Sequence, residues 1–455
     1  MSWRNLLQFD HGEKNTFNFF WGGGLKKGWD MLIKNIAINF LAQGYLLLLS
    51  FFTIPFVLGK LGEDKYGIFL LATALVGYFT TLDFGLGVAL TKKISELRSG
   101  SPKKLDLYLS TAFFSYIVLA LVFSVCLFFL TPFISHNILH LTGELNLLSV
   151  AVFHLTALNI GLYFLTSYTD ALFQGFERFD FYNLKTFIVG TANTLGVAGV
   201  LWRGYGLEQA VLVIFASLLI TLIFSLVIAR YYLKINIGRF VFSKDCFKEM
   251  SAFGIFKFFS NVFSQLNFHL PKFFIAYFSG IGEVSLFTIP FSLVQKTSIL
   301  LSQISLSIFP QTSYLKAKGK FKRIRSILFK GEAFVALIMI VFLIAGLLWG
   351  EKFLLWWLKD PIFVNKSLPI FYFLIIAYFV RSFTAIPVAI VEGLGNTKLP
   401  SIFAAFNSLL TIGLGFILIK WQGALGAAIL IFVYVIVGVP IFLAFAYRFF
   451  KKEFL

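Results

Sequence analysis

The chain is a succession of long apolar runs separated by short polar segments. A helix that crosses the hydrocarbon of a bilayer needs roughly 20 mainly apolar residues. Runs of this length, with glycine and proline inside them, indicate membrane helices rather than barrel strands of roughly ten alternating residues. The pattern therefore predicts an all-α membrane protein of about twelve transmembrane helices. The predicted spans are about 35–59, 66–90, 106–131, 148–170, 183–202, 207–229, 249–278, 284–310, 327–350, 368–391, 400–419 and 424–447.

The amino-acid composition indicates that most of the chain lies in the lipid bilayer. Of the 455 residues, 58% are hydrophobic and 13% are charged. A soluble domain with this balance would expose apolar residues on every face and aggregate. The two cysteines, Cys126 and Cys246, lie in separate segments and suggest neither a disulfide nor a metal site.

Positive charge is distributed unequally between the two sides of the predicted topology. With the N-terminus inside, the segments on that side hold 28 of the 39 Lys and Arg residues, counting Lys185 and Lys330 at the inner ends of their spans, and the opposite segments hold 7. Because membrane proteins concentrate Lys and Arg in cytoplasmic loops, both termini are predicted to be cytoplasmic. The net charge of +18 then faces anionic membrane lipids, and no nucleic-acid partner is needed to explain it.

Four short sequence motifs occur twice, in the same order and at a spacing of 218 to 222 residues. The pairs are Asn39–Gln43 with Asn261–Gln265, Gly62-Glu63 with Gly282-Glu283, Ala171–Phe176 with Ala389–Leu394, and Trp202–Gly206 with Trp421–Gly426. A regular offset of this kind indicates an internal duplication.

The duplication predicts two six-helix lobes. Each half has an even number of spans and enters the membrane from the same side, so the halves should be related by a pseudo-two-fold axis along the membrane normal, with substrate bound between them. The expected parts are a cytoplasmic or interfacial arm at 1–34, lobes at 35–230 and 249–448, a cytoplasmic linker at 231–248 and a cytoplasmic tail at 449–455.

The remaining four cations lie inside predicted spans, namely Lys257, Lys272, Lys296 and Arg381. A Lys or Arg at the bilayer centre costs about 2.5–3.5 kcal/mol on insertion scales. Lys296 and Arg381 fall near the midplane and are predicted to line a central cavity, although a structural ion pair is an alternative. Lys257 and Lys272 are closer to the span ends, where a cavity position and snorkelling to the headgroups are equally consistent with the sequence.

No acidic residue is expected at the depth of these cations. A cavity with uncompensated positive charge attracts a phosphate or diphosphate, not a cationic drug. Polar side chains within the spans should hydrogen-bond either a sugar or a neighbouring helix. They are Asn39, Gln43, His154, Asn159, Asn261, Gln265, His269 and Gln295, and we select Asn39, Gln43, Asn261 and Gln265 as candidates for the cavity lining.

The second predicted span carries a distinctive local pattern. It begins with Glu63-Asp-Lys-Tyr-Gly-Ile-Phe69, continues to Leu82-Asp-Phe-Gly-Leu-Gly87 and is followed by Lys92-Lys93. With the span count and the six-plus-six repeat, this pattern resembles the Wzx-type polysaccharide flippases. That family shares a superfamily with the multidrug (MATE) exporters and the lipid II flippases.

The resemblance implies a protein of the bacterial inner membrane that moves undecaprenyl-diphosphate-linked oligosaccharide to the periplasmic face, for O-antigen, capsule or exopolysaccharide assembly. It further implies alternating access coupled to H⁺ or Na⁺, a polysaccharide polymerase and chain-length proteins as partners, and no cofactor. Lys296 and Arg381 match the anionic headgroup by type and depth. Asp83 matches the family's Asp-Phe-Gly pattern, where ion coupling or gating competes with a structural role at a helix end.

Other transporters and membrane enzymes fit the sequence less well. A multidrug exporter needs acidic and aromatic residues in its cavity for organic cations, and a lipid II flippase should have fourteen spans. A polysaccharide polymerase or ligase needs a large periplasmic loop, whereas the longest predicted outside loops have about 17 residues. The sequence contains no P-loop, HExxH motif or catalytic triad, so we expect neither an enzyme nor a metalloprotein.

Overall fold

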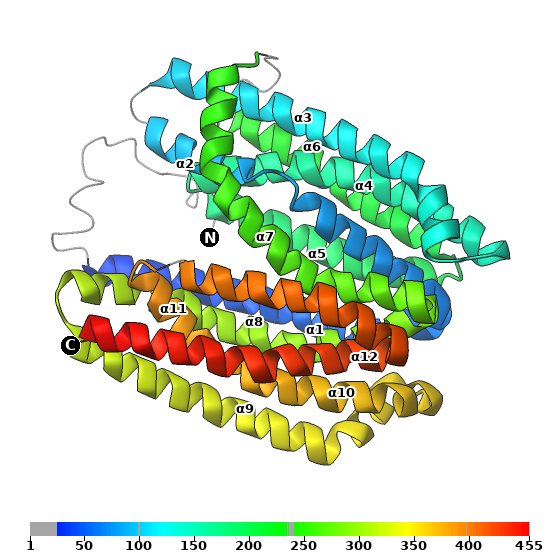
Figure 1. Cartoon of the computed structure of the whole chain (residues 1–455). Helices are drawn as coiled ribbons and strands as arrows, with labels where there is room; N and C mark the ends of the chain where they lie inside the picture. Colours follow the sequence, from blue (N-terminus) through cyan, green and yellow to red (C-terminus); the bar gives the residue numbers. More distant parts are fainter. Residues whose placement is uncertain (1–24, 99–100, 234, 236–240, 397, 455) are drawn as a thin grey trace, which may run out of the picture. The chain divides into compact units, whose positions relative to one another are not determined.

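The computed structural model describes residues 25–98, 101–233, 235, 241–396 and 398–454. Within these residues the chain is helical and contains no strand, which confirms the predicted all-α class (Figure 1). The helices are α1 (Leu25–Thr80), α2 (Leu86–Leu97), α3 (Pro102–Phe133), the π-helix η2 (Ile134–Ile138), α4 (Gly143–Gly175), α5 (Phe179–Trp202), α6 (Leu207–Tyr231), α7 (Lys244–Ser279), α8 (Ile281–Ala317), α9 (Phe321–Leu358), α10 (Pro361–Ser382), α11 (Ala385–Gly393) and α12 (Lys398–Phe454). The chain divides into two compact units, Met1–Leu48 and Leu49–Leu455.

Eight helical segments of the described chain are long and apolar enough to cross a membrane. They are Gly44–Thr80, Pro102–Ile138, Gly143–Gly175, Phe179–Trp202, Leu207–Tyr231, Phe321–Leu358, Pro361–Gly393 and Lys398–Glu453. The chain is therefore a multi-pass membrane protein.

Two of these segments, in α1 and α12, are pairs of helices that reverse at a glycine. α12 has 57 residues, and a straight helix of that length would extend for about 85 Å. Instead its two arms meet, because the rings of Phe403 and Phe442 are 5.0 Å apart. The reversals occur at Gly62 in α1, where φ is 75°, and at Gly423 in α12, where φ is 53°. Such left-handed values favour glycine because a side chain would be strained there.

Two predicted spans contain a break instead of a continuous helix. The second span, predicted at 66–90, stops at Thr80, and α2 begins six residues later, because Phe84 and Gly85 adopt positive φ values of 53° and 72°. The tenth span, predicted at 368–391, breaks between α10 and α11. Pro387 lies in the first turn of α11 and has no N–H for the helix to use, which accounts for the interruption.

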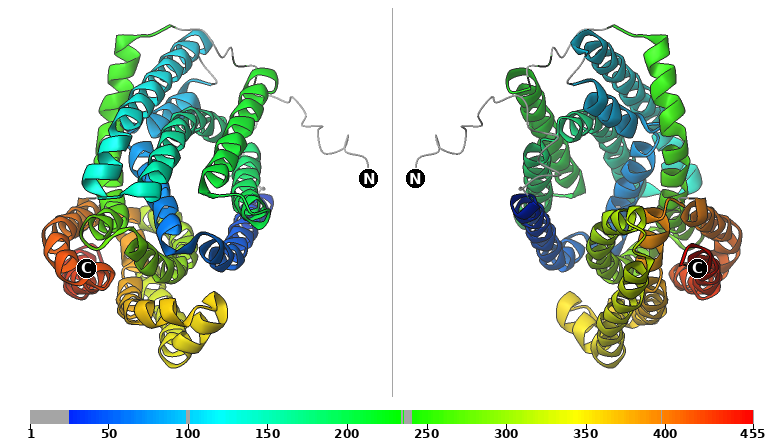
Figure 2. Two further views of the ribbon diagram at one scale, coloured as in Figure 1. Left: turned by 90° about the vertical axis from the view of Figure 1, so that its right-hand side faces the viewer. Right: turned by 90° about the vertical axis from the view of Figure 1, so that its left-hand side faces the viewer.

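The helices from α2 to α12 pack in two groups joined by α7. In the first group α4 contacts α2, α3 and α6, and α6 contacts α5; in the second α10 contacts α8, α9 and α12, and α8 contacts α11. Figure 2 shows these groups as the cyan-to-green helices and the yellow-to-red helices. α7 packs on α2 and α3 and also on α8 and α12. Near its start, Glu249 accepts hydrogen bonds from Lys93 and Tyr108 of the first group.

One helix contact occurs in the same form in both groups. Ser95 donates to the carbonyl of Gly175 at 3.3 Å, and Ser313 donates to the carbonyl of Gly393 at 2.8 Å. Both members of the second bond lie 218 residues beyond those of the first, which is the offset of the repeated Ala171–Phe176 motif. The glycine of that motif is needed because another helix passes directly over it.

We predict that adding a methyl group at either glycine destabilises the protein. A Cβ on Gly175 would lie 2.7 Å from the Cβ of Ile94, and one on Gly393 would lie 2.7 Å from the Cβ of Thr312. Overpacking of this kind costs about 1–3 kcal/mol. Gly175→Ala and Gly393→Ala should therefore each lower the midpoint temperature of unfolding, measured on purified protein by fluorescence-detected gel filtration after heating.

Gly199 provides the matched control, since it is also helical and nothing lies within 4 Å of its added Cβ. Gly199→Ala should leave the midpoint unchanged or raise it slightly through better helix propensity. Equal midpoints for all three variants would contradict the role given to the repeated contact.

Candidate substrate-binding site

A first cavity of about 300 Å³ lies among α1, α4, α5 and α6. We call this the first cavity; its lining is Ser50, Thr53, Ile54, Val57, Tyr66, Phe69, Ala72, Thr73, Val76, Thr156, Asn159, Tyr163, Asn193, Thr194, Val197, Val211 and Ile214. Nine of these seventeen side chains bear a hydroxyl or an amide, and none is charged. Both arms of α1 contribute to the lining, so the reversal at Gly62 is what closes this side of the cavity.

Lys296 reaches the edge of the first cavity from the other group of helices. Its Nζ donates a hydrogen bond of 2.9 Å to Oγ of Ser50, one of the lining hydroxyls. Lys296 itself is half-buried on α8. The predicted cavity position of Lys296 thus has a geometric basis, although its function in binding stays a prediction.

A row of three aromatic rings carries a cation at each end. The ring centroids of Phe268 and Phe291 are 5.2 Å apart, and those of Phe291 and Tyr378 are 6.1 Å apart. Nζ of Lys272 lies 4.8 Å from the centroid of Phe268, and the guanidinium carbon of Arg381 lies 5.5 Å from that of Tyr378. An aromatic face stabilises a cation within roughly 6 Å of its centroid. α7, α8 and α10 therefore place two of the predicted cations on one cluster.

These two cations differ in exposure. Lys272 is only 4% exposed, so its side chain is covered by protein and does not extend to the lipid headgroups, contrary to the snorkelling alternative. Arg381 is exposed although it lies within a packed helix of the second group. Among the side chains that the structure describes, Lys272, Lys296 and Arg381 take part in none of the ion pairs.

The structure describes the side chains of only some of the other predicted site residues. Asn261 and Gln265 are half-buried on α7 and do not line the first cavity. The side chains of Lys257, Asn39 and Gln43 lie outside the described part of the chain. Of the wider polar set, Asn159 is the residue that lines the first cavity.

Asp83 stabilises the turn between α1 and α2. Its carboxylate accepts hydrogen bonds from the backbone N–H of Gly85 at 2.9 Å and of Gly87 at 3.3 Å, and from the hydroxyl of Tyr116 at 3.3 Å. These bonds stabilise the turn and so provide the helix-end role that competed with ion coupling. Asp83 also lines a second cavity of about 240 Å³, together with Tyr116 and Asp170.

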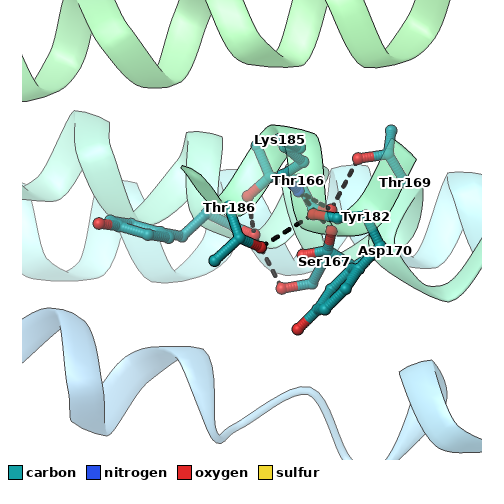
Figure 3. A network of polar contacts seen from close by, with 8 residues as sticks. Thr166, Ser167, Thr169, Asp170, Tyr182, Lys185 and Thr186 are labelled. Atoms are coloured by element: carbon teal, nitrogen blue, oxygen red, sulfur yellow. Dashed lines mark hydrogen bonds and ion pairs between the residues drawn. The ribbon is translucent and has the colours of Figure 1, made fainter. Parts of the chain in front are cut away.

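The second cavity borders a buried ion pair that the sequence interpretation missed. Nζ of Lys185 is 2.6 Å from Oδ1 of Asp170 and donates at 3.2 Å to the carbonyl of Thr166 (Figure 3). Lys185 is only 6% exposed. The charge count from the sequence places Lys185 with the cytoplasmic lysines, at the inner end of the predicted span 183–202. The available signal was its position: Asp170 and Lys185 stand at similar distances on either side of the turn after Gly175, and antiparallel helices joined by a short turn place such residues at one depth.

Comparison with known proteins decides the family. Residues 32–316 match the model of a family described as polysaccharide biosynthesis protein. The chain belongs to this family. Residues 255–417 also match the MatE family model.

Relatives of the chain are named as transporters and not as enzymes. A Shigella flexneri protein named as an O-antigen transporter is 25% identical over 404 residues, covering 88% of this chain and 93% of that protein. The fold is similar to an inward-facing multidrug MATE transporter, with a TM-score of 0.78, 13% identity and coverage of 89% and 95%. It is also similar to the lipid II flippase MurJ in an inward closed conformation, with a TM-score of 0.70, 16% identity and coverage of 91% and 88%.

We predict that the pair of the buried Lys185 with the half-buried Asp170 stabilises the fold only when both charges are present. Removing one partner of a buried ion pair leaves an uncompensated charge and costs about 3–5 kcal/mol. Asp170→Asn and Lys185→Met should each lower the midpoint temperature of unfolding. The combination Asp170→Leu with Lys185→Met should recover much of the loss, because no buried charge remains.

The pair between Lys65 and Glu144 is the control, since its side chains are 42% and 85% exposed. An exposed pair contributes about 0–1 kcal/mol, so Lys65→Met should leave the midpoint nearly unchanged. A double variant less stable than both singles would show that the charges are not coupled.

Proposed function

We propose that the chain is a flippase that carries an undecaprenyl-diphosphate-linked oligosaccharide from the cytoplasmic to the periplasmic face of the inner membrane. The observation that carries this proposal is Lys296, a cation without an acidic partner among the described residues, hydrogen-bonded to Ser50 at the edge of a hydroxyl-lined cavity. A cation of this kind suits a diphosphate, and neutral hydroxyls and amides suit a sugar. The O-antigen transporter relative and the flippase with a similar fold support the assignment.

The proposed architecture has twelve spans in two six-helix lobes, 35–230 and 249–448, with both termini in the cytoplasm. Counting the arms of α1 and α12 separately supports the span number. The repeated serine–glycine bond, Ser95 with Gly175 and Ser313 with Gly393, supports a pseudo-two-fold axis between the lobes. Arg381 is assigned to the anionic headgroup with Lys296. Lys272 is covered by protein in this conformation and is assigned to the headgroup only in a state of the cycle that uncovers it. The conformational cycle is taken to be coupled to H⁺ or Na⁺.

Alternating access requires a gate on each face, and we place the outer gate at the repeated Gly-Glu turns. The hydroxyl of Ser285 donates to the carbonyl of Glu63 at 2.9 Å, which joins the turn between the arms of α1 to the turn between α7 and α8. A Cβ on Gly67 would lie 2.1 Å from the carbonyl oxygen of Ile281, so the contact is close. Both similar structures are described as inward-facing or inward closed, in accord with a closed outer face.

The proposal is tested in the host bacterium by deleting the gene and restoring it in variant forms. Without the chain, the lipid-linked oligosaccharide should accumulate where a membrane-impermeant periodate–hydrazide label added to spheroplasts cannot reach it. Lys296→Ala and Arg381→Ala should each restore labelling about tenfold or more slowly than the unaltered gene, because each removes a charged hydrogen-bond donor.

Lys352→Ala is the control, since Lys352 is an exposed cation near the predicted outer end of α9. It should restore labelling fully, and immunoblots should show equal amounts of all variants. Normal labelling in the deletion strain, with no second flippase present, would refute the function. Normal labelling with both cations replaced would refute their role alone.

A further inference from the structure

The threonine hydroxyls that line the first cavity are all already used as hydrogen-bond donors. Four of its threonines donate their hydroxyl hydrogens to backbone carbonyls of their own helices. These bonds are Thr53 to Leu49 at 2.9 Å, Thr73 to Leu70 at 2.8 Å, Thr156 to Val152 at 2.8 Å and Thr194 to Gly190 at 2.8 Å. A hydroxyl has one hydrogen and two lone pairs, so these oxygens can only accept a further bond. The lining therefore presents these four oxygens as acceptors, beside tyrosine hydroxyls and asparagine amides that can both donate and accept.

Two other lining residues also carry acceptor oxygens. Asn159 is 2% exposed, and its Oδ1 has no hydrogen-bond partner. An unsatisfied buried acceptor costs about 1–3 kcal/mol, which a ligand donor would recover. Ser50 Oγ already accepts from Lys296 at the cavity edge. The acceptors and the cation thus occupy adjacent parts of one continuous surface.

We infer that the first cavity is the subsite for the sugar portion of the substrate and that it binds sugar hydroxyl groups as hydrogen-bond donors. The inference rests on the proposed function and deepens it, because it separates the glycan from the diphosphate at Lys296. An ionised phosphate has only acceptors, so it gains no bond from the four threonine oxygens, whereas a sugar hydroxyl can donate to them and accept from the neighbouring amides. A bare metal cation fits less well, since no carboxylate lines the cavity and its volume of about 300 Å³ suits a small organic group.

Binding by the purified full chain in nanodiscs tests the inference with two probes. One is undecaprenyl diphosphate without sugar, and the other is the lipid-linked oligosaccharide extracted from the host after deletion of the gene. The combined variant Thr156→Val with Asn159→Leu should bind the oligosaccharide lipid about tenfold more weakly, through the loss of two acceptors. Its affinity for bare undecaprenyl diphosphate should not change. Lys296→Ala should weaken binding of both probes.

The matched control is Thr221→Val with Asn407→Leu. Thr221 is 3% exposed and bonds its own helix, and Asn407 is 9% exposed with an unpartnered Oδ1, but neither lines the first cavity. This variant should bind both probes normally. Thr73→Val is a second test variant, because Thr73 is exposed and its replacement leaves helix packing intact.

Failure of the proposed function and failure of the sugar-subsite inference give different binding results. If the unaltered chain binds neither probe, the proposed function fails. If it binds both, the inference is overturned when the cavity variants weaken binding of the two probes equally or leave binding of both unaffected.

Discussion

A cation at membrane depth must be surrounded by protein, water or a bound anion, because lipid tails offer it no partner. In this chain, protein contacts on and around α8 meet that requirement. Lys272 and Arg381 lie on a row of aromatic rings from α7, α8 and α10, and Lys296 bonds Ser50 of α1. Meeting the requirement without acidic partners leaves positive charge available to a ligand, which is the basis of the proposed diphosphate site.

The acidic residues serve a different purpose in the first group of helices. Asp170 neutralises Lys185 within the protein, and Asp83 holds the turn between α1 and α2. Their charge is used to stabilise this group, while the first cavity keeps a neutral lining. The two groups thus differ in the chemistry they present, and the proposed substrate, with a charged diphosphate and a neutral glycan, differs along its length in the same way.

The helical class and the glycines of the repeated contact could be predicted from the sequence because both depend on patterns along the chain. Apolar runs define spans, and Ala171–Phe176 and its copy mark the glycines under a crossing helix. The ion pair of Asp170 with Lys185 was missed because it depends on packing between α4 and α5. Likewise, the choice of Asn159 over Asn261 as a cavity residue requires knowing which face of each helix points inward.

The proposed transport of the lipid substrate depends on opening at the repeated Gly-Glu turns. A Cβ on Gly282 would lie 3.6 Å from the Cβ of Glu63, within the roughly 3.5–4.5 Å separation that a disulfide needs. Glu63→Cys with Gly282→Cys, in a chain with Cys126 and Cys246 changed to alanine, should therefore form a disulfide. The measurement is flipping of the lipid-linked oligosaccharide in proteoliposomes, with oxidant and then with reductant. We predict that oxidation stops flipping and reduction restores it. Full flipping by the cross-linked protein would contradict the account.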